Sequence, residues 1–421
     1  MSRLVIYGGQ QLHGQARVSG SKNAALPQLA ACLLSSSPCV LRGIPDIVDV
    51  HVMTALLRRL GAEVSELKGG GPGRCLRVDA ASLTGWEVPE ALMREMRSSI
   101  ILMGALLGRM GKARLSHPGG CAIGDRPIGF HVDMLRALGA RIDTRDGFLE
   151  ASAARLQGAD CVLEYPSVGT TENVMLAAVL SRGTTVIRNA AREPEVVDLQ
   201  GFLNGMGARV RGAGTDTIRI EGVETLYGTE HTVIPDRIEA GTLMAACLIA
   251  GGRVVLQNVV AEHLDAVIAK FREAGAVIVP SGDTLTVSAP GEIMATDFRT
   301  LPYPGFPTDM QPQAMALMTV AKGPSVLTET VYPKRFKHAD ELRRLGANLR
   351  IEGSTAIIRG VSRLSGCTVS ATDLRAGACL VLAGLVAEGL TAVEGVSHID
   401  RGYDCLEGKL ASLGARIQRQ A

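Results

Sequence analysis

Two kinds of predicted helix alternate along the chain and differ in how their apolar positions are arranged. Segments such as ENVMLAAVL, AGTLMAACLIA and GACLVLAGLVA are apolar nearly all round, which is typical of a buried helix. Segments such as KFREAG and ELRRLG carry charged side chains on one face, which predicts exposure on that side. We therefore expect the buried helices to have sheets outside them, the reverse of the layering in a TIM barrel.

The exposed helices recur at a regular interval, and each ends at a glycine. The glycine is followed by alanine and then by residues typical of a strand, as in LLRRLGAEV and KLASLGARI. A glycine just after a helix end suits a left-handed cap, where a Cβ atom would clash. Successive glycines are 68 to 78 residues apart, so a unit of about 70 residues occurs six times. The six glycines are Gly61, Gly139, Gly207, Gly275, Gly346 and Gly414.

Each unit is predicted to be a βαβαββ repeat, because a β-branched strand such as TTVIRN or RVVLQN separates its two helices. The repeat alone leaves two groupings open: one continuous solenoid of six units, or two clusters of three units. A length of 421 residues indicates two or three domains, so two clusters fit ordinary domain sizes better.

Composition and charge exclude several classes of protein. A hydrophobic content of 46% supports folded cores and excludes a disordered or fibrous chain. The net charge is +2 with scattered charges, so no basic stripe indicates nucleic-acid binding. No apolar stretch approaches the length of a membrane span, and the N-terminus does not resemble a signal peptide. The nine cysteines form no CxxC pair or zinc-type cluster, so we expect reduced, buried thiols in a cytoplasmic protein.

Polar and charged residues gather at the predicted starts of the buried helices, where free backbone N–H groups favour anions. These residues are Lys22, Asn23, Arg97, Asp309, Asp373 and Arg375. Two explanations stay open for Asp309 and for Asp373: the aspartate caps its helix, or it belongs to a charged cleft. Because such residues occur in most of the units, we favour one shared, highly charged cleft.

A glycine-rich loop at residues 117–127 has the sequence HPGGCAIGDRP. Its three glycines predict mobility, and Arg126 is a cation of the kind that lowers the pKa of a nearby thiol such as Cys121. We therefore expect a functional thiol here, although a buried, inert thiol is the commoner role of a cysteine. A second loop, SHIDRGY, brings another arginine, Arg401.

Several well-known catalytic motifs are missing from the chain. It has no Walker A loop, no GxGxxG, no GxSxG and no HExxH segment, which argues against ATP hydrolysis, nicotinamide redox chemistry and zinc hydrolysis. The lysine, arginines, aspartates and thiol described above suit a multiply anionic substrate and acid–base chemistry at carbon or at a hydroxyl.

Short segments from one end of the chain to the other resemble the bacterial UDP-N-acetylglucosamine enolpyruvyl transferases, also called UDP-N-acetylglucosamine 1-carboxyvinyltransferases, of peptidoglycan synthesis. They are SGSKNAALP, MRSS, PGGCAIGDRP, PSVGTTEN, NAAREPEVVDL, GTD, PDRIEAGT, FPTDMQ, ETVYPKRF, ATDLRAG and HIDRGY. The resemblance implies an α/β fold of two inverted (inside-out) α/β barrel domains, each of three βαβαββ repeats. It implies one domain at residues 22–234 and another at residues 1–21 and 235–421, with the active site in the cleft between them.

The resemblance also implies a reaction. The enolpyruvyl group of phosphoenolpyruvate would pass to the 3′-hydroxyl of UDP-N-acetylglucosamine with release of phosphate, by addition and elimination through a tetrahedral intermediate. No metal or organic cofactor would be needed. Cys121 would donate the proton, form an adduct with phosphoenolpyruvate and react with the epoxide antibiotic fosfomycin, while Asp309 would act as base at the sugar hydroxyl.

The resemblance assigns the remaining site residues to the two substrates. Those expected at the phosphate and carboxylate of phosphoenolpyruvate are Lys22, Arg126, Asp373, Arg375 and Arg401. Those expected at the UDP-sugar are Asn23, Arg97, Arg126, Pro127, Ile128, Gly129, Phe130, His131, Ser167, Val168, Asp309 and Val331. The chain departs from the family pattern at Ile101, at Tyr165 and over residues 128–130, in the region of the uridine and diphosphate contacts.

Three alternatives are less well supported. A 5-enolpyruvylshikimate-3-phosphate synthase shares the implied fold and chemistry, but that family does not use the PGGC cysteine. An inactive scaffold that binds a nucleotide sugar or a partner does not explain why the catalytic residues are all present. A cyclase acting on RNA ends also uses βαβαββ units, but the charge balance does not favour it. We therefore expect two small-molecule substrates as partners, without nucleic acid or membrane; the sequence does not predict the oligomeric state.

Overall fold

A computed structural model describes residues 2–69, 71–116 and 128–420. They form two compact units, which we name by their place in the sequence. The central unit contains the described residues between Gly20 and Ile234, and the terminal unit joins the residues up to Ser19 with those from Pro235 onward. The chain thus enters the central unit at Gly20, two residues before the expected boundary at residue 22.

One repeat of the central unit shows the pattern that all six repeats share. Its elements are β10 (Asp160–Val162), α6 (Val168–Ala178), β11 (Thr184–Arg188), α7 (Pro194–Gly205), β12 (Arg209–Arg211) and β13 (Thr217–Glu221). β10 and β11 are parallel and are joined through α6, because parallel neighbours need a crossover connection. β13 pairs antiparallel with both β11 and β12. All six sheets in the described part of the chain have four strands in this arrangement, which confirms the predicted βαβαββ repeat.

The two other repeats of the central unit follow the same order. The first contains β14 (Glu230–Thr232), α1 (Lys22–Ala31), β3 (Cys39–Ile44), α2 (Val48–Arg59), β4 (Glu63–Glu66) and β5 (Arg74–Asp79). The second contains β6 (Glu87–Val88), α4 (Leu102–Met110), β7 (Lys112–Ser116), α5 (Gly129–Ala137), β8 (Arg141–Arg145) and β9 (Phe148–Ser152). The short helices η1 (Cys32–Leu34), α3 (Glu90–Glu95) and η2 (Arg97–Ile101) lie beside α1 and α4 in the sequence.

The terminal unit contains the remaining three repeats. The first has β2 (Leu12–Arg17), α8 (Arg237–Ala250), β15 (Gly252–Gln257), α9 (Asp265–Glu273), β16 (Val277–Ser281) and β17 (Thr284–Ser288). The next has β18 (Phe298–Arg299), α10 (Gln311–Met318), β19 (Pro324–Thr328), α11 (His338–Arg344), β20 (Asn348–Glu352) and β21 (Thr355–Arg359). The last has β22 (Thr368–Ser370), α12 (Leu374–Val386), β23 (Leu390–Glu394), α14 (Leu406–Ser412), β24 (Arg416–Gln420) and β1 (Arg3–Tyr7). Short helices η3 (Ala261–Leu264), η4 (Thr308–Met310) and α13 (Val396–Ile399) complete the unit.

Three sheets are completed by strands from distant parts of the sequence. β1 lies between β23 and β24, and β2 pairs in parallel with β15, so the N-terminal residues close two sheets of the terminal unit. β14 pairs in parallel with β3, so the last strand of the central unit joins its first. The pairings of β1 and β2 explain how the three repeats of the terminal unit are built from two separate stretches of chain.

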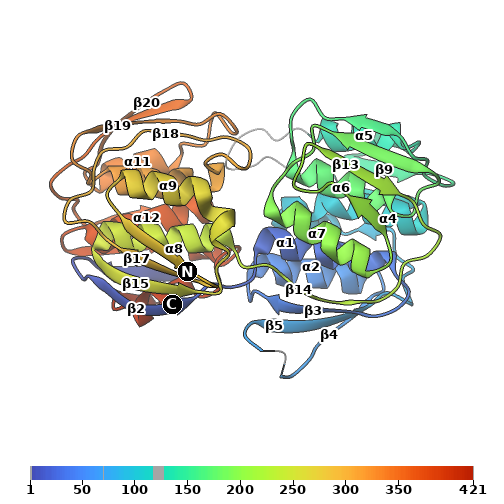
Figure 1. Cartoon of the computed structure of the whole chain (residues 1–421), viewed down its shortest axis with the longest axis horizontal. Helices are drawn as coiled ribbons and strands as arrows, with labels where there is room; N and C mark the ends of the chain where they lie inside the picture. Colours follow the sequence, from blue (N-terminus) through green and yellow to red (C-terminus); the bar gives the residue numbers. More distant parts are fainter. Residues whose placement is uncertain (1, 70, 117–127, 421) are drawn as a thin grey trace. The chain divides into compact units, whose positions relative to one another are not determined.

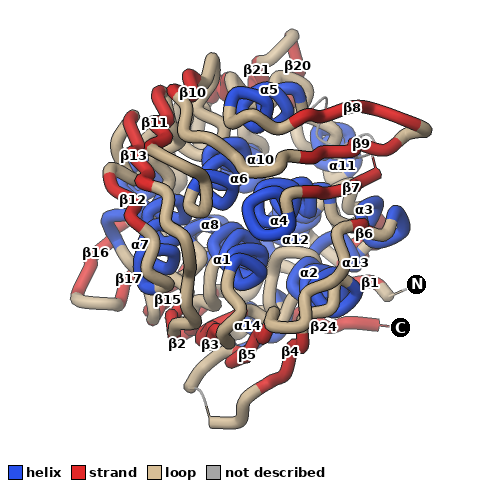
Figure 2. Tube along the Cα trace, turned by 90° about the vertical axis from the view of Figure 1, so that its right-hand side faces the viewer, coloured by secondary structure: helices blue, strands red, loops and turns tan. Residues whose placement is uncertain are grey.

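The first helix of each repeat is enclosed within its unit, as Figures 1 and 2 show for the helices and the strands around them. In α8 every residue from Ile238 to Ile249 is buried, and in α12 every residue from Arg375 to Leu385. A helix that is apolar nearly all round has no face suited to water, so it takes the middle of the unit and the sheets cover it. This is the inverted layering predicted from the sequence. No helix in the described residues is both long and apolar enough to cross a membrane.

The second helix of each repeat is buried on one face only. In α9, Val267, Ile268 and Phe271 are buried while Arg272 and Glu273 are exposed. The glycine that follows each of these six helices has a positive φ, between 89° and 103°. The predicted left-handed helix ends are therefore confirmed in all six repeats.

The expectation that the cysteines are buried is wrong at one described position and only partly met at another. Six described cysteines are buried and free, and Cys367 is half-buried, but Cys405 is exposed. Cys405 lies in a surface turn with φ 51°, directly before α14. It interrupts a polar loop, so no neighbouring apolar periodicity indicated which way its side chain points.

Candidate active site

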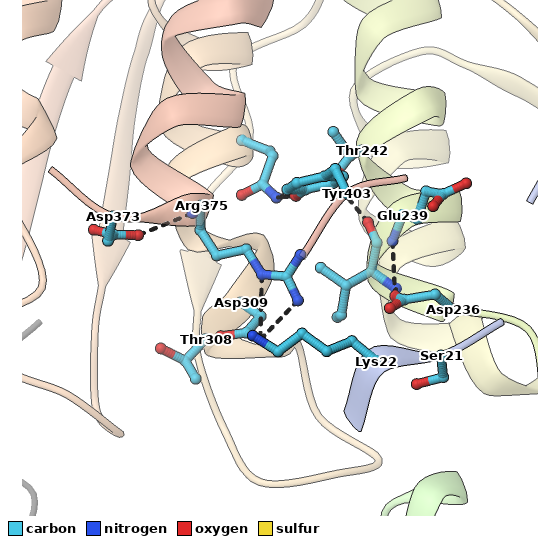
Figure 3. Close-up of polar contacts among 12 residues, drawn as sticks. Ser21, Lys22, Asp236, Glu239, Thr242, Thr308, Asp309, Asp373, Arg375 and Tyr403 are labelled. Atoms are coloured by element: carbon cyan, nitrogen blue, oxygen red, sulfur yellow. Dashed lines mark hydrogen bonds and ion pairs between the residues drawn. The ribbon is translucent and has the colours of Figure 1, made fainter. Parts of the chain in front are cut away.

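Asp309 lies in η4, just before α10, and its carboxylate pairs with two arginines. Arg335 Nη1 lies 2.8 Å from Oδ1, and Arg375 Nη2 lies 3.2 Å from Oδ2 (Figure 3 shows Arg375 and Asp309). The two arginine side chains are only 3% and 1% exposed, whereas the Asp309 side chain is 26% exposed. Asp309 does not cap α10. Of its two possible roles, helix cap or member of a charged cluster, the structure therefore favours the charged cluster. Two cations on one carboxylate favour its ionised form, and its exposed part is accessible to a ligand.

Asp373 is, in contrast, the N-cap of α12. Its carboxylate accepts hydrogen bonds from the backbone N–H groups of Arg375 and Ala376, at 2.9 and 3.0 Å. The cap places the Arg375 side chain in the first turn of a buried helix. Burial alone would lower the pKa of Arg375, but the nearby Tyr403 and Asp309 outweigh it and raise that pKa. Arg375 is therefore a permanent buried cation.

Tyr403 holds Arg375 from the side opposite Asp309 (Figure 3). The centre of its ring lies 5.1 Å from the guanidinium carbon. Its hydroxyl lies 3.0 Å from Thr242 Oγ1 on α8 and accepts from Gln313 Nε2 on α10 at 3.2 Å. Burial raises the pKa of Tyr403. A small polar layer thus joins the three buried helices of the terminal unit and supports the cation.

Lys22 is the first residue of α1 in the central unit. Ser21 caps this helix by accepting the N–H of Ala24 at 3.4 Å. The Lys22 ammonium lies 2.8 Å from Asp49 Oδ2 on α2, and the two side chains are 11% and 1% exposed. A carboxylate at this distance keeps a buried lysine charged, as a role in binding anions requires. Asp49 was not among the expected site residues.

His131 and Ser167, both expected at the UDP-sugar, lie close together in the central unit. Ser167 caps α6, and a Cβ placed on Gly169 in its first turn would come within 3.4 Å of the His131 ring. His131 Nδ1 lies 2.9 Å from the amide nitrogen of Asn173, whose oxygen accepts the N–H of Gly104 at 2.7 Å. That second bond orients the amide, so Asn173 donates to Nδ1 and the neutral ring carries its proton on Nε2.

Ile128, Gly129 and Phe130 lie at the start of α5 beside His131, and Val168 is the first residue of α6. Each is at least partly exposed, so all four stay available for a ligand.

Other expected residues are placed less completely. Asn23 is partly exposed in the first turn of α1. Arg97 begins η2, but its side chain lies outside the described part of the structure. Cys121, Arg126 and Pro127, and with them the predicted loop at residues 117–127, lie outside the described residues. Their roles stay predictions.

Arg401 and Val331 lie in loops of the terminal unit. Arg401 follows α13 and is half-buried. Its neighbour Asp400 pairs with Arg419 on β24 at 2.6 Å, which ties this loop to the sheet. The Val331 backbone N–H donates to Glu329 Oε1 at 2.8 Å, so the turn that carries Val331 is held from within the unit.

Comparison with known proteins agrees with this fold. The family model described as EPSP synthase (3-phosphoshikimate 1-carboxyvinyltransferase) matches residues 6–410. A relative from Symbiobacterium thermophilum, UDP-N-acetylglucosamine 1-carboxyvinyltransferase 1, is 59% identical over 99% of this chain and 95% of its own length. UDP-N-acetylglucosamine 1-carboxyvinyltransferase 2 of Carboxydothermus hydrogenoformans is 51% identical over 100% of this chain and 99% of its own.

This chain belongs to the UDP-N-acetylglucosamine 1-carboxyvinyltransferase family. Solved structures agree with that membership. The enolpyruvyl transferase NikO from Streptomyces tendae has a TM-score of 0.89 at 28% identity and covers 100% of this chain and 99% of its own. EPSP synthase from Acinetobacter baumannii has a TM-score of 0.75 at 19% identity, with 100% of both chains covered, and shows the shared fold alone. The chain is thus an enolpyruvyl transferase with the fold of two inverted α/β barrels.

Sequence reasoning missed several residues that lie at the candidate site of this 1-carboxyvinyltransferase family member. Arg335 lies in ETVYPKRF, a segment noticed only as a family signature, and Tyr403 lies in HIDRGY. Neither residue is at the start of a buried helix, the position at which the sequence pattern indicates candidate site residues. A search for charges inside the family signatures could have found Arg335. In the described part of the chain, no three His, Cys, Asp or Glu side chains gather into a possible metal site.

Proposed function

We propose that this enzyme transfers the enolpyruvyl group of phosphoenolpyruvate to the 3′-hydroxyl of UDP-N-acetylglucosamine and releases phosphate. The observation that carries the proposal is the 59% identity to a UDP-N-acetylglucosamine 1-carboxyvinyltransferase over 99% of the chain. The reaction would serve peptidoglycan synthesis in the cytoplasm.

The reaction has two steps, an addition followed by an elimination. In the addition, the 3′-oxygen bonds to C2 of phosphoenolpyruvate, its proton leaves to a base, and C3 gains a proton from an acid. In the elimination, the C2–O bond to the phosphate breaks, C3 gives a proton to a base, and the enol ether and free phosphate are formed. The protein has to supply one base, one acid and cations around the phosphate and carboxylate.

Asp309 suits the role of base at the sugar hydroxyl. Its pairing with Arg335 and Arg375 favours an ionised carboxylate, which has no proton to give and can only accept one. Its partly exposed side chain supports contact with a substrate. Cys121 is the proposed acid at C3, a role that rests on the family resemblance of the PGGC segment.

The proposed cations and polar groups lie in both units. Lys22 of the central unit, with Arg126 and Arg401, would bind the phosphate and carboxylate of phosphoenolpyruvate. Arg375 is a buried cation beside Asp309, and its fixed positive charge supports a role near the anionic substrate. That these groups act in one cleft stays a prediction.

The proposed UDP-sugar contacts form three groups. Residues 128–131 and Ser167-Val168 occur together at the starts of α5 and α6, which supports a common role in binding. Asn23, Arg97, Arg126 and Pro127 form the second group, and Asp309 and Val331 the third.

Phosphate release from phosphoenolpyruvate tests the proposal directly. We expect release with UDP-N-acetylglucosamine as acceptor, and none with shikimate-3-phosphate or without an acceptor. Release with shikimate-3-phosphate alone would contradict the proposed acceptor and favour the activity in the name of the matching family model. No release with either acceptor would favour an inactive scaffold.

Peptide mapping tests the role of Cys121. Fosfomycin should label Cys121, and the exposed Cys405 provides an internal comparison, because a general alkylating reagent should label it as well. Fosfomycin label on Cys405 instead would contradict the assignment. Cys121→Asp should retain some turnover if the residue acts only as an acid, since a carboxyl also donates a proton.

A further inference from the structure

Glu329 is a fully buried carboxylate for which the proposed chemistry has no direct use. It follows β19, and its exposed fraction is 0%. Oε1 accepts hydrogen bonds from Thr300 Oγ1, Val331 N and Tyr332 N at 2.8, 2.8 and 2.9 Å. Oε2 accepts from Thr308 Oγ1 at 2.9 Å. A buried carboxylate is costly unless donors fill its lone pairs, and here donors from three segments do so.

The bond at Oε2 sets the direction of the next hydrogen bonds. The Thr308 hydroxyl has a single proton and donates it to Glu329 Oε2. The Thr308 oxygen is then left as an acceptor, and Arg335 Nη1 donates to it at 3.0 Å. The same Nη1 lies 2.8 Å from Asp309 Oδ1. Glu329 and Thr308 therefore orient the guanidinium that holds the proposed base.

The bonds at Oε1 hold the turn at residues 330–332. Two N–H groups of this turn point at the Glu329 carboxylate, and the Thr300 hydroxyl, which donates to Glu329, accepts the N–H of Thr330 at 2.9 Å. The Tyr332 carbonyl accepts the N–H of Arg335 at 2.9 Å, so the same turn also places the arginine. This branch fixes the backbone at Val331, the expected UDP-sugar contact.

We propose that Glu329 and Thr308 are positioning residues: Thr308 orients Arg335 and Asp309 for proton abstraction, and Glu329 directs Thr308 while also holding the turn at Val331. The proposal rests on the proposed function, in which Asp309 takes the proton of the sugar hydroxyl. Its two branches differ in what they support. The Thr308 branch serves the chemical step, and the Val331 branch serves binding of the UDP-sugar.

Steady-state kinetics of phosphate release separate the two branches. Thr308→Val keeps the shape of the side chain and removes the hydroxyl. We expect kcat to fall roughly 10- to 100-fold, because a small misplacement of a catalytic group has costs of that size, while KM for UDP-N-acetylglucosamine stays within about twofold. Thr308→Ser keeps the hydroxyl and should restore kcat to within about threefold of the wild type.

Glu329→Gln is nearly isosteric but introduces a donor where the site needs an acceptor. We expect it to lower kcat as Thr308→Val does and also to raise KM for UDP-N-acetylglucosamine about tenfold, because the Val331 turn loosens. In the double variant the losses in kcat should not multiply, since both changes break one relay.

Thr319→Val is the matched control. Thr319 is a buried threonine of the same unit whose hydroxyl donates to the Ala316 carbonyl at 2.6 Å, away from the relay. It should lower the melting temperature as Thr308→Val does but leave kcat unchanged. The positioning role is overturned if Thr308→Val retains wild-type kcat, or if Thr308→Ser and Thr319→Val lose as much as Thr308→Val. If the wild-type chain itself does not turn over UDP-N-acetylglucosamine, the proposed function fails, and the positioning role fails with it.

Discussion

The Asp309 carboxylate lies 2.8 Å from the Arg335 guanidinium, although the two residues are 26 positions apart in the chain. Arg335 is almost fully buried. Burial alone would lower the pKa of Arg335, but the charges of Asp309 and Asp373 outweigh it and raise that pKa. Arg375 is held on the other oxygen of the same carboxylate. Asp309 is therefore as much a counter-charge for two buried cations as a candidate base.

Asp309→Asn should consequently impair stability as well as activity. The change keeps the shape of the side chain but leaves Arg335 and Arg375 without the carboxylate between them. We expect the free energy of unfolding, measured with a denaturant, to fall by about 3 kcal/mol or more, because removing one partner of a buried ion pair leaves the other charge uncompensated. Phosphate release should fall by a factor on the order of 10² to 10⁴.

Asp160→Asn is the matched control for the effect on stability. Asp160 pairs with Arg188 at 2.9 Å, and both side chains are more than half exposed. The same substitution should cost less than about 1 kcal/mol there. Similar losses for the two variants would show that the buried pairs of Asp309 are not special.

His338 predicts a loss of stability in mild acid. Burial lowers the pKa of His338 from 6.5 to about 4, and Nε2 lies 3.1 Å from the sulfur of Met315. Between pH 6.5 and pH 4 the His338 side chain therefore binds a proton in the unfolded chain but stays neutral in the folded protein. Stability is fully present above pH 6.5 and is lost as the pH falls towards 4, by on the order of 3 kcal/mol at about 1.4 kcal/mol per pKa unit.

Unfolding curves of two histidine variants check this assignment. His338→Gln should remove most of the decline between pH 6.5 and 4, whatever its constant cost in packing. His13→Gln replaces an exposed histidine and should keep the wild-type decline. The assignment is wrong if the decline persists unchanged in His338→Gln.

Much of the fold could be predicted from the sequence because the signals are local. A helix that is apolar all round has to be buried, and a glycine after a charged helix marks its end, so six repeats and their inverted layering followed. The pairing of β1 with β23 and of β14 with β3 joins residues from distant parts of the chain. No local pattern carries that information.

The candidate site was only partly predictable for the same reason. Lys22, Asp373 and Arg375 were noticed because they stand at helix starts. The structure assigns Asp373 to a cap and Asp309 to an ion pair, a choice that depends on where Arg335 lies in space. Asp49 and Glu329 are buried acids inside ordinary-looking segments, and only their three-dimensional partners mark them.

One substitution, glycine to alanine, should have opposite effects at two positions. Gly346 follows α11 with φ 94°, and a Cβ there would meet no atom within 4 Å, so the expected cost of about 1 kcal/mol comes from the backbone alone. Gly201 lies within α7 and is exposed, and its Cβ would make an ordinary contact 3.8 Å from the His231 ring. Gly201→Ala should stabilise by about 0.5 to 1 kcal/mol. If both substitutions changed the free energy of unfolding in the same direction, measured with a denaturant, the assignment of these backbone conformations would be contradicted.

Glu172 should limit the stability of the protein at high pH. It is buried in α6, and burial, followed by the charges of Glu195 and Glu193, raises its pKa well above the usual value. A carboxyl whose pKa is raised by folding contributes stability that is fully present below its unfolded pKa and is lost as the pH rises through the folded pKa.

Glu172→Gln does not titrate, so its free energy of unfolding should rise relative to the wild type as the pH increases from 4 to 9. Glu164→Gln changes the net charge equally at an exposed position and should show no such trend. If the difference between Glu172→Gln and the wild type is flat across this range, Glu172 does not carry the pH dependence, and the ionised form must be accommodated in the folded protein.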